Sequence, residues 1–314
     1  MFTIKQPSTI IFGKYSSQDY KIPKDSLVVT SSGAKSRNWL EYVGLTDSYI
    51  YDNIESNPSI ETTEQIMSEF SNSNFSNIIG IGGGSVLDVA KFVAYKMKKI
   101  KIMIPTTFGS GSEVTRIAVL KVNGKKQSFH DDNIFADIAI VDPYFIHNTP
   151  DVIIKNSAID ACAQCTEGYD SKTSNAYTKF LCQKAFEILE NAILNEKYED
   201  LAYGSLCAGL GFGNTSTTLG HALSYVFSNE GFSHGHALAH TTTLAHKFNK
   251  SIFYNRFLQL VKKLKFAPIS LKTNLDEAAN LILTDKKHLE NNPKIVNKKE
   301  IVGLLEQAIK NVIQ

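Results

Sequence analysis

The chain has 314 residues and a mass of 34.8 kDa, above the size at which one hydrophobic core usually stops growing, so we expect two compact domains. Hydrophobic residues make up 43% and charged residues 20%, a balance that excludes a disordered or low-complexity chain. The 33 basic and 31 acidic side chains leave a net charge of +2, which excludes a surface built to bind nucleic acid or anionic lipid.

The first half of the chain alternates short apolar runs with helix-like segments. The runs between residues 26 and 150 are LVVTSS, SYIYDN, NIIGIGGG and KIMIPTT. This alternation predicts a doubly wound parallel sheet, because consecutive parallel strands need a helical crossover. Residues 115–141 predict a β meander that contains a two-residue hairpin with its turn at Asn123 and Gly124. We therefore expect an α/β dinucleotide-binding domain over residues 1–148, with a β-hairpin insertion.

The second half has a different period. From residue 151 onward the helical period dominates and strand signals almost vanish, so residues 149–314 predict an all-α domain. The chain starts without a basic and apolar leader, and it has no apolar stretch of the ~18 residues that a membrane span needs. We expect a cytoplasmic protein that has no membrane partner and whose four cysteines are reduced.

A glycine-rich loop follows one of the predicted strands. Gly82, Gly83, Gly84 and Ser85 lie between the run NIIGI and a helix expected from Val86. Glycines let the backbone approach an anion, and the helix start offers unpaired N–H groups, so this loop predicts a pyrophosphate site. The alternative is a tight turn that binds no ligand.

A second polar loop follows the strand KIMIP and contains Thr106, Thr107 and Ser110. In a parallel sheet the carboxyl ends of the strands meet at one crevice, so both loops are expected to face the same ligand. The alternative is that these hydroxyls cap a helix begun by SEVTR.

Oxygen and nitrogen ligands cluster in the helical half. Asp160, Gln164 and Glu167 share one helix stripe, and four of the eight histidines fall within twenty residues, namely His221, His234, His236 and His240. One carboxylate and two imidazoles from separate elements suit Fe²⁺ or Zn²⁺ with an open position. The alternative for each single histidine is packing or capping.

Four motifs in this order resemble the iron-containing alcohol dehydrogenase family. They are GGGSVLDVAK, PTTFGSGSEVT, IDACAQCTEGY and the pair His221 with His234-Gly235. The resemblance covers nearly the whole chain and implies NAD(P)H-dependent aldehyde reduction, with a divalent metal held in a cleft by one aspartate and three histidines. Asp160, His221 and His234 match three of these ligands.

The fourth ligand position falls on Gln164, where the family has histidine. Three interpretations are open: Gln164 binds through its amide oxygen, water or Glu167 takes its place, or the site holds no metal. We favour a retained but weakly occupied site, because the remaining set still has two histidines and one carboxylate. The family's further active-site histidine is Tyr225 here, which predicts a different proton relay.

The resemblance also implies the cofactor contacts. They fall on the glycine loop, on Asp88, Thr106, Thr107 and Ser110, and on Lys126, the lysine that the family carries beyond the hairpin. NAD-preferring relatives have an aspartate after the first strand, but this chain has Ser31 and Ser32 followed by Lys35 and Arg37. A 2′-phosphate would meet no carboxylate there, so we expect NADPH rather than NADH.

The substrate is predicted from the same resemblance. The stretches SEVTRIAVLKVNGKKQS and NTSTTLGHALSY, with His234-Gly235-His236, are most similar to the branch that reduces phosphonoacetaldehyde to 2-hydroxyethylphosphonate. Arg116 and His236 are the candidate contacts for such an anion. The alternatives are a general short-chain alcohol or aldehyde dehydrogenase, a lyase of the dehydroquinate-synthase type, and a metal-free binding relative. A homodimer is a family-level expectation.

Overall fold

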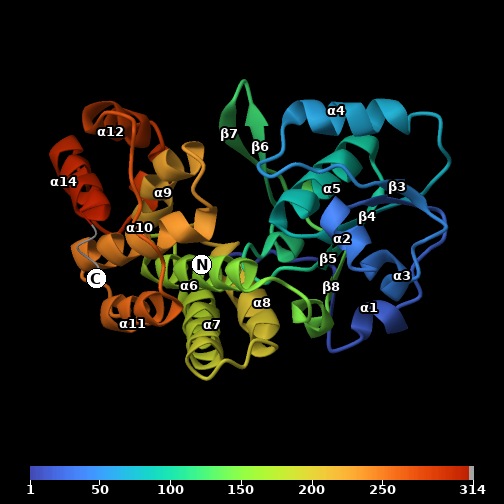
Figure 1. Cartoon of the computed structure of the whole chain (residues 1–314), viewed down its shortest axis with the longest axis horizontal. Helices are drawn as coiled ribbons and strands as arrows, with labels where there is room; N and C mark the ends of the chain where they lie inside the picture. Colours follow the sequence, from blue (N-terminus) through green and yellow to red (C-terminus); the bar gives the residue numbers. More distant parts are fainter. Residues whose placement is uncertain (311–314) are drawn as a thin grey trace. The chain divides into compact units, whose positions relative to one another are not determined.

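The computed structural model describes residues 1–310. The chain divides into two compact units, with the division between Thr149 and Pro150. The first unit holds all the β structure of the described chain, and the second is helical. Figure 1 shows both units in colours that follow the sequence.

The first unit is built on a parallel sheet of six strands in the order β1-β8-β5-β4-β2-β3. Every neighbouring pair is parallel. The central strands are buried along their length, as strands covered on both faces must be. The strands are Thr9–Phe12 (β1), Ser26–Val29 (β2), Tyr49–Tyr51 (β3), Asn77–Gly82 (β4), Ile100–Pro105 (β5) and Ile138–Val141 (β8).

The predicted doubly wound sheet is confirmed, but the meander over residues 115–141 is only partly right. Ile117–Val122 (β6) and Lys125–His130 (β7) do form the expected hairpin, with positive φ at Asn123 and Gly124. The run Ile138–Val141, however, joins the main sheet between β1 and β5. The sequence interpretation also omitted β1. Both errors concern short strands whose partners lie far away in the chain.

Helices cover both faces of this sheet. They are Ser16–Asp19 (α1), Ser32–Ser36 (α2), Trp39–Val43 (α3), Ile60–Glu69 (α4) and Gly84–Met97 (α5). In Figure 1, α4 and α5 lie on one side of the strands, and α1 and α3 lie on the other. The segment SEVTR, whose alternative interpretation is a helix start, forms only a 3-10 turn over Ser112–Val114.

Asp142, directly after β8, is fully buried and links residues 15–17 to the end of the sheet through hydrogen bonds. Its carboxylate accepts hydrogen bonds from the backbone N–H groups of Tyr15, Ser17 and Tyr144 and from the hydroxyls of Ser17 and Tyr42. Such a charged acceptor contributes most when every donor around it is buried, because each donor would otherwise be left unpaired.

Asp142→Asn is therefore expected to lower the free energy of unfolding by about 3 kcal/mol, since an amide cannot accept from all of these donors. Urea unfolding followed by circular dichroism measures the change. Asp47→Asn, at an exposed position of the same unit, is the matched control and should stay within about 0.5 kcal/mol of the wild type. Equal stabilities of the two variants would contradict this role for Asp142.

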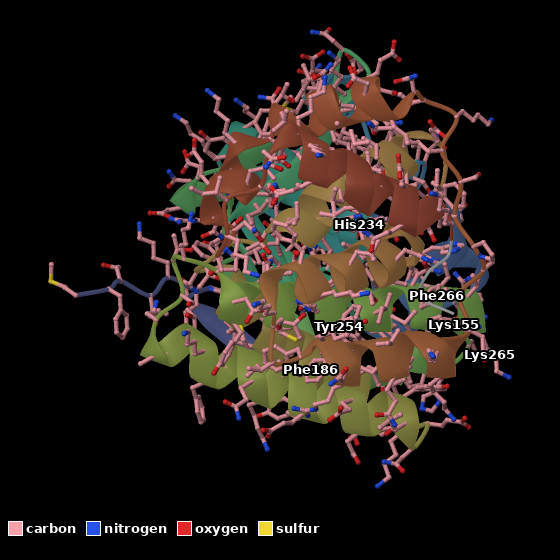
Figure 2. The ribbon with its side chains drawn as sticks, turned by 90° about the vertical axis from the view of Figure 1, so that its left-hand side faces the viewer. Lys155, Phe186, His234, Tyr254, Lys265 and Phe266 are labelled. Atoms are coloured by element: carbon pink, nitrogen blue, oxygen red, sulfur yellow. The ribbon has the colours of Figure 1, made fainter. Side chains whose placement is uncertain are left out.

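The second unit contains helices joined by loops and no strand over residues 150–310. Its core includes Phe186 of α7, labelled in Figure 2, whose ring packs 5.0 Å from that of Phe253. No helix of the described residues has the length and apolarity to cross a membrane. The helices are Asp151–Asp170 (α6), Ala176–Leu194 (α7), Asp200–Phe212 (α8), Leu219–Asn229 (α9), His234–Asn249 (α10), Tyr254–Leu264 (α11), Leu275–Leu283 (α12), Lys286–Asn291 (α13) and Lys298–Ile309 (α14).

Candidate metal centre and cofactor edge

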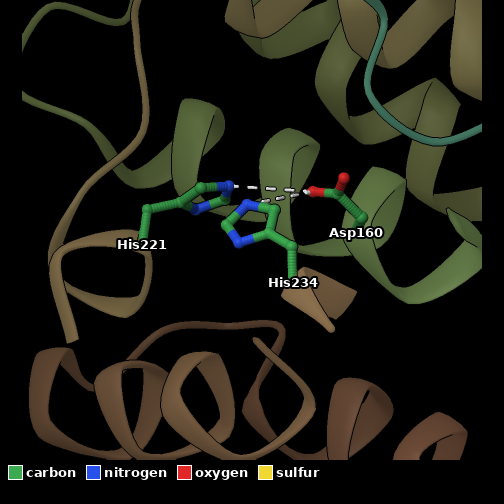
Figure 3. A group of neighbouring side chains, drawn as sticks. All are labelled: Asp160, His221 and His234. Carbon is green, nitrogen blue, oxygen red and sulfur yellow. Dashed lines mark ion pairs between the residues drawn. The ribbon is translucent and has the colours of Figure 1, made fainter. Parts of the chain in front are cut away.

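Three side chains from three helices of the second unit converge on one point. Asp160 lies in the middle of α6, His221 in the first turn of α9, and His234 opens α10. Asp160 Oδ1 is 3.8 Å from His221 Nε2 and 3.9 Å from His234 Nε2, as Figure 3 shows. One ligand atom from each residue lies within 4.8 Å of the other two. This group can hold a divalent metal ion.

His221 is oriented by Glu167, one turn after Gln164 on α6. The Nδ1 of His221 donates to Glu167 Oε2 at 2.5 Å, and the same carboxylate accepts from the N–H groups of Thr218 and Gly220 at the start of α9. Both carboxylate oxygens are thus engaged, so Glu167 supports a ligand rather than serving as one. A ligating histidine commonly donates its second ring N–H to a carboxylate in this way.

The electrostatics of the group favour positive charge. Burial by itself would lower the pKa of His221, but the carboxylates of Glu167 and Asp160 outweigh burial and raise this pKa. Burial would raise the pKa of Glu167, but the partnership with His221 lowers it. His221 Nε2 is buried and makes no hydrogen bond. A buried nitrogen that faces a carboxylate and lacks a hydrogen bond fits a coordinated metal ion.

Two further predicted residues surround this group. Gln164 donates from Nε2 to Asp160 Oδ1 at 3.0 Å, so its amide nitrogen orients the carboxylate. The ring of Tyr225 stacks on that of His234 at 6.1 Å, with only 10° between the ring planes. The structure therefore gathers both residues around the three ligands, and a catalytic role for Tyr225 remains a prediction.

His236 and His240 face away from the group. Two residues after His234 on the same helix, the His236 side chain turns to another side, where its Nε2 is 2.6 Å from the carbonyl oxygen of Ala267. Its ring also packs against Phe266, which is labelled with His234 in Figure 2. His240 Nε2 is 2.9 Å from the same carbonyl. Only two of the four clustered histidines thus reach the candidate metal centre, and the predicted substrate contact of His236 stays a prediction.

The predicted cofactor loops share one edge of the sheet in the first unit. Ser31 follows β2, Gly83 follows β4 and Thr106 follows β5, all at the carboxyl ends of parallel strands. The strand order changes direction between β2 and β4, and such a switch point is where open α/β sheets bind ligands. Thr106 N–H donates to Gly82 O at 2.9 Å, which ties the second loop to the first.

The glycine loop is built for close approach of the backbone. Gly83 caps α5 without a side chain, so no side chain satisfies the first N–H groups of the helix. A Cβ on Gly84 would lie 2.8 Å from Ser110 Oγ, and one on Gly83 would lie 3.0 Å from Thr107 Oγ1. The hydroxyls of the second loop therefore occupy the space that side chains would need. Gly82 to Ser85 thus form a helix start whose backbone N–H groups no side chain of the cap covers, and pyrophosphate binding there remains a prediction.

Asp88 has a structural role beneath this loop. Its carboxylate accepts from Ser112 Oγ at 2.6 Å and from Val119 N at 3.0 Å. Lys91, one turn later on α5, is fully buried and donates to the carbonyl oxygens of Ser112 and Thr115. Helix α5 thus holds the segment that follows the second polar loop. A direct cofactor contact by Asp88 stays a prediction.

Lys126 and Arg116 lie around the hairpin. Lys126 is within the second hairpin strand, β7, opposite Lys121, and not beyond the hairpin as the resemblance implied. Arg116 Nη1 bonds Asp132 Oδ1 at 2.8 Å. Arg116 and His236 belong to different units, so their joint contact with one substrate remains a prediction.

The cations near Ser31 and Ser32 have partners within the chain. Lys35 Nζ pairs with Asp52 Oδ2 at 3.0 Å, and Arg37 donates to Gly33 O at 2.8 Å. Asp52 follows β3, the strand next to β2. This edge therefore contains a carboxylate from the neighbouring strand, although the segment after β2 that favoured NADPH has none.

Two family models cover most of the chain. The iron-containing alcohol dehydrogenase model matches residues 7–143, and the C-terminal model of the same family matches residues 154–282. The chain belongs to the iron-containing alcohol dehydrogenase family. The resemblance stated from the motifs is thereby confirmed.

Several curated members of the family are similar over part of their length. The 4-hydroxybutyrate dehydrogenase of Clostridium kluyveri is 34% identical over 209 residues, which cover 57% of this chain and 56% of that protein. The long-chain-alcohol dehydrogenase 1 of Geobacillus thermodenitrificans is 32% identical over 206 residues, which cover 56% and 52%. The alignments thus span about half the length of these relatives.

Solved structures of other proteins share the fold along nearly the whole chain. An iron-containing alcohol dehydrogenase from Thermotoga maritima has a TM-score of 0.89 at 24% identity and covers 99% of this chain and 100% of that one. A sulfoacetaldehyde reductase from Bifidobacterium kashiwanohense, in complex with NAD+, has a TM-score of 0.88 at 21% identity and covers 98% and 99%. At these identities the likeness establishes the fold.

One residue beside the metal centre was not found from the sequence. His288 in α13 is buried, and its ring lies 6.3 Å from His221 and 5.7 Å from Tyr225. Its Nδ1 bonds Asp285 Oδ2 at 2.7 Å. The Asp-x-x-His spacing in DKKH was the available signal, but it lies 54 residues after the nearest ligand histidine, His234, and outside the four family motifs.

Proposed function

We propose that this chain reduces a small aldehyde to a primary alcohol, using a nicotinamide cofactor and a divalent metal, Fe²⁺ or Zn²⁺. The observation that carries the proposal is the group of Asp160, His221 and His234, in which a buried imidazole nitrogen without a hydrogen bond faces a carboxylate. Family membership and the glycine loop at the sheet's switch point support the nicotinamide cofactor.

Each residue of the group has a definite task in this reaction. Asp160, His221 and His234 would hold the ion, which when bound would polarise the aldehyde oxygen as a Lewis acid. Glu167 accepts the hydrogen bond of His221 Nδ1, so Nε2, 3.8 Å from Asp160 Oδ1, is the nitrogen that would bind the ion. Gln164 fixes the Asp160 carboxylate through Oδ1. The cofactor, when bound, would supply a hydride from its reduced ring, and water would supply the proton that converts the alkoxide to the alcohol.

For the substrate we propose a two- to four-carbon aldehyde with an acidic group, and phosphonoacetaldehyde in particular. Two similar proteins support this class, because 4-hydroxybutyrate and sulfoacetaldehyde are both short chains that end in an acid. Arg116 and His236 are the proposed contacts for the anion. We propose NADPH as the preferred cofactor, a homodimer as the assembly and the cytoplasm as the location.

The test is a rate measurement on the metal-loaded protein. NADPH or NADH consumption is followed with phosphonoacetaldehyde, sulfoacetaldehyde, succinic semialdehyde and propanal, before and after chelation of the metal. We expect turnover that is lost on chelation and returns with Fe²⁺ or Zn²⁺, with the highest kcat/KM for phosphonoacetaldehyde. Turnover that survives complete metal removal would overturn the proposal. Equal kcat/KM values for propanal and the aldehydes with an acidic group would overturn the proposed substrate class and indicate a general aldehyde reductase.

A further inference from the structure

The search for a fourth metal ligand starts from the two side chains nearest to the group. The Gln164 amide nitrogen donates to Asp160 Oδ1, the oxygen that also faces both ligand imidazoles. Glu167 spends both oxygens on His221 Nδ1 and the start of α9. Through these atoms both side chains act on a candidate ligand. Neither is a histidine, so an imidazole in place of the family's third histidine would have to come from another helix.

His288 offers an imidazole at this place. It is 8% exposed, and its ring lies nearly parallel to that of His221, with 12° between the planes. Tyr225 contacts His288 edge-on and stacks on His234, so four rings pack around the centre. His288 lies in α13, a different helix from those that contain the three candidate ligands.

The hydrogen bonding of His288 repeats that of His221. In each residue Nδ1 faces a carboxylate, Asp285 for His288 and Glu167 for His221. A carboxylate on Nδ1 keeps the proton there and leaves Nε2 as a free lone pair, which is the usual arrangement of a metal-ligating histidine. An imidazole nitrogen also binds Fe²⁺ or Zn²⁺ better than an amide oxygen does.

We propose that His288, oriented by Asp285, is a fourth protein ligand of the metal ion and replaces the imidazole that this chain lacks at Gln164. This inference rests on the proposed metal centre. The ligand atoms of Asp160, His221 and His234 already lie within 4.8 Å of one another, and His288 stands outside that group. Ligation therefore requires His288 and Asp285 to move together toward His221 when the ion binds.

The test measures metal binding directly, with turnover recorded separately. The dissociation constant for Zn²⁺ is measured by competition with a chromophoric chelator, and the Co²⁺-substituted protein is examined by visible absorption. We expect His288→Ala to weaken Zn²⁺ binding by at least ~10–100-fold and to change the cobalt d–d bands. His236→Ala is the matched control for metal affinity, because its imidazole faces Ala267 O, and it should bind Zn²⁺ like the wild type.

A second variant separates ligation from packing. His288→Cys should retain part of the Zn²⁺ affinity and should give the Co²⁺ protein a thiolate-to-metal charge-transfer band in the near ultraviolet. Such a band requires direct coordination. Wild-type affinity and d–d bands in His288→Ala, or no such band in the folded His288→Cys protein, would overturn the inference, as would a loss of affinity found in Gln164→Ala alone.

The experiments distinguish a failure of this ligand assignment from a failure of the proposed function. A wild-type protein that binds Zn²⁺ through His288 but consumes no reduced cofactor with any aldehyde would overturn the function and leave the ligand in place. Metal-dependent aldehyde reduction by the wild type, together with unchanged cobalt d–d bands in His288→Ala, would overturn the ligand and leave the function in place.

Discussion

Gly235→Ala is expected to lower the free energy of unfolding by about 3 kcal/mol and to abolish tight metal binding. A Cβ at this position would lie 2.0 Å from the carbonyl oxygen and 2.6 Å from the carbonyl carbon of Asn156. Both atoms belong to the backbone of α6, so neither can turn away. The start of α10 would have to move off α6, and it would take His234 with it, away from Asp160.

Urea unfolding and the Zn²⁺ dissociation constant measure the two effects. Gly303→Ala is the matched control, because Gly303 is also helical and a Cβ there meets nothing within 4 Å. That change should raise stability by roughly 0.5–1 kcal/mol and leave metal binding intact. A Gly235→Ala protein with wild-type stability and affinity would show that α6 and α10 are not held this closely.

Asp160→Asn is expected to weaken metal binding at least ~100-fold and to reduce aldehyde turnover by a similar factor. The amide keeps the shape of the side chain but removes the charge that faces both Nε2 atoms at 3.8 and 3.9 Å. A metal ion between two neutral imidazoles loses its only directly facing carboxylate among the described ligands.

Metal content after gel filtration and initial rates at saturating Fe²⁺ or Zn²⁺ check this result. Asp151→Asn removes an exposed carboxylate from the first turn of the same helix and should change neither quantity. If Asp160→Asn kept its metal and its rate, the assignment of the centre would be wrong.

The strands and helices with a regular side-chain period could be predicted from the sequence. The buried strands β2, β4 and β5, the helical second unit and the Asn-Gly hairpin follow from local patterns, because side-chain period and turn chemistry act over a few residues. β1 and β8 were missed or misplaced because each has four residues and pairs with a distant strand. Their assignment needed tertiary contacts.

The candidate metal centre could likewise be predicted only in part from the sequence. Residue type and spacing restricted the donors to one stripe of α6 and to four clustered histidines, since metal chemistry limits the possible ligands. The family resemblance then selected Asp160, His221 and His234 from these donors. The separate tasks of Glu167 and Gln164 were not accessible, because helical spacing places them on one stripe with Asp160 and does not say which oxygen meets which donor.

The sequence by itself determined the two-part architecture and the family, because the first depends on local periodicity and the second on ordered motifs, and the family resemblance supplied three candidate ligands. The tertiary structure alone decided which histidines lie near the candidate metal centre. His236 and His240 turn to Ala267, while His288 of α13, 54 residues after His234, lies beside His221. The physical reason is that the direction of a side chain is set by the packing of its helix against other helices, and that packing joins residues far apart in the chain.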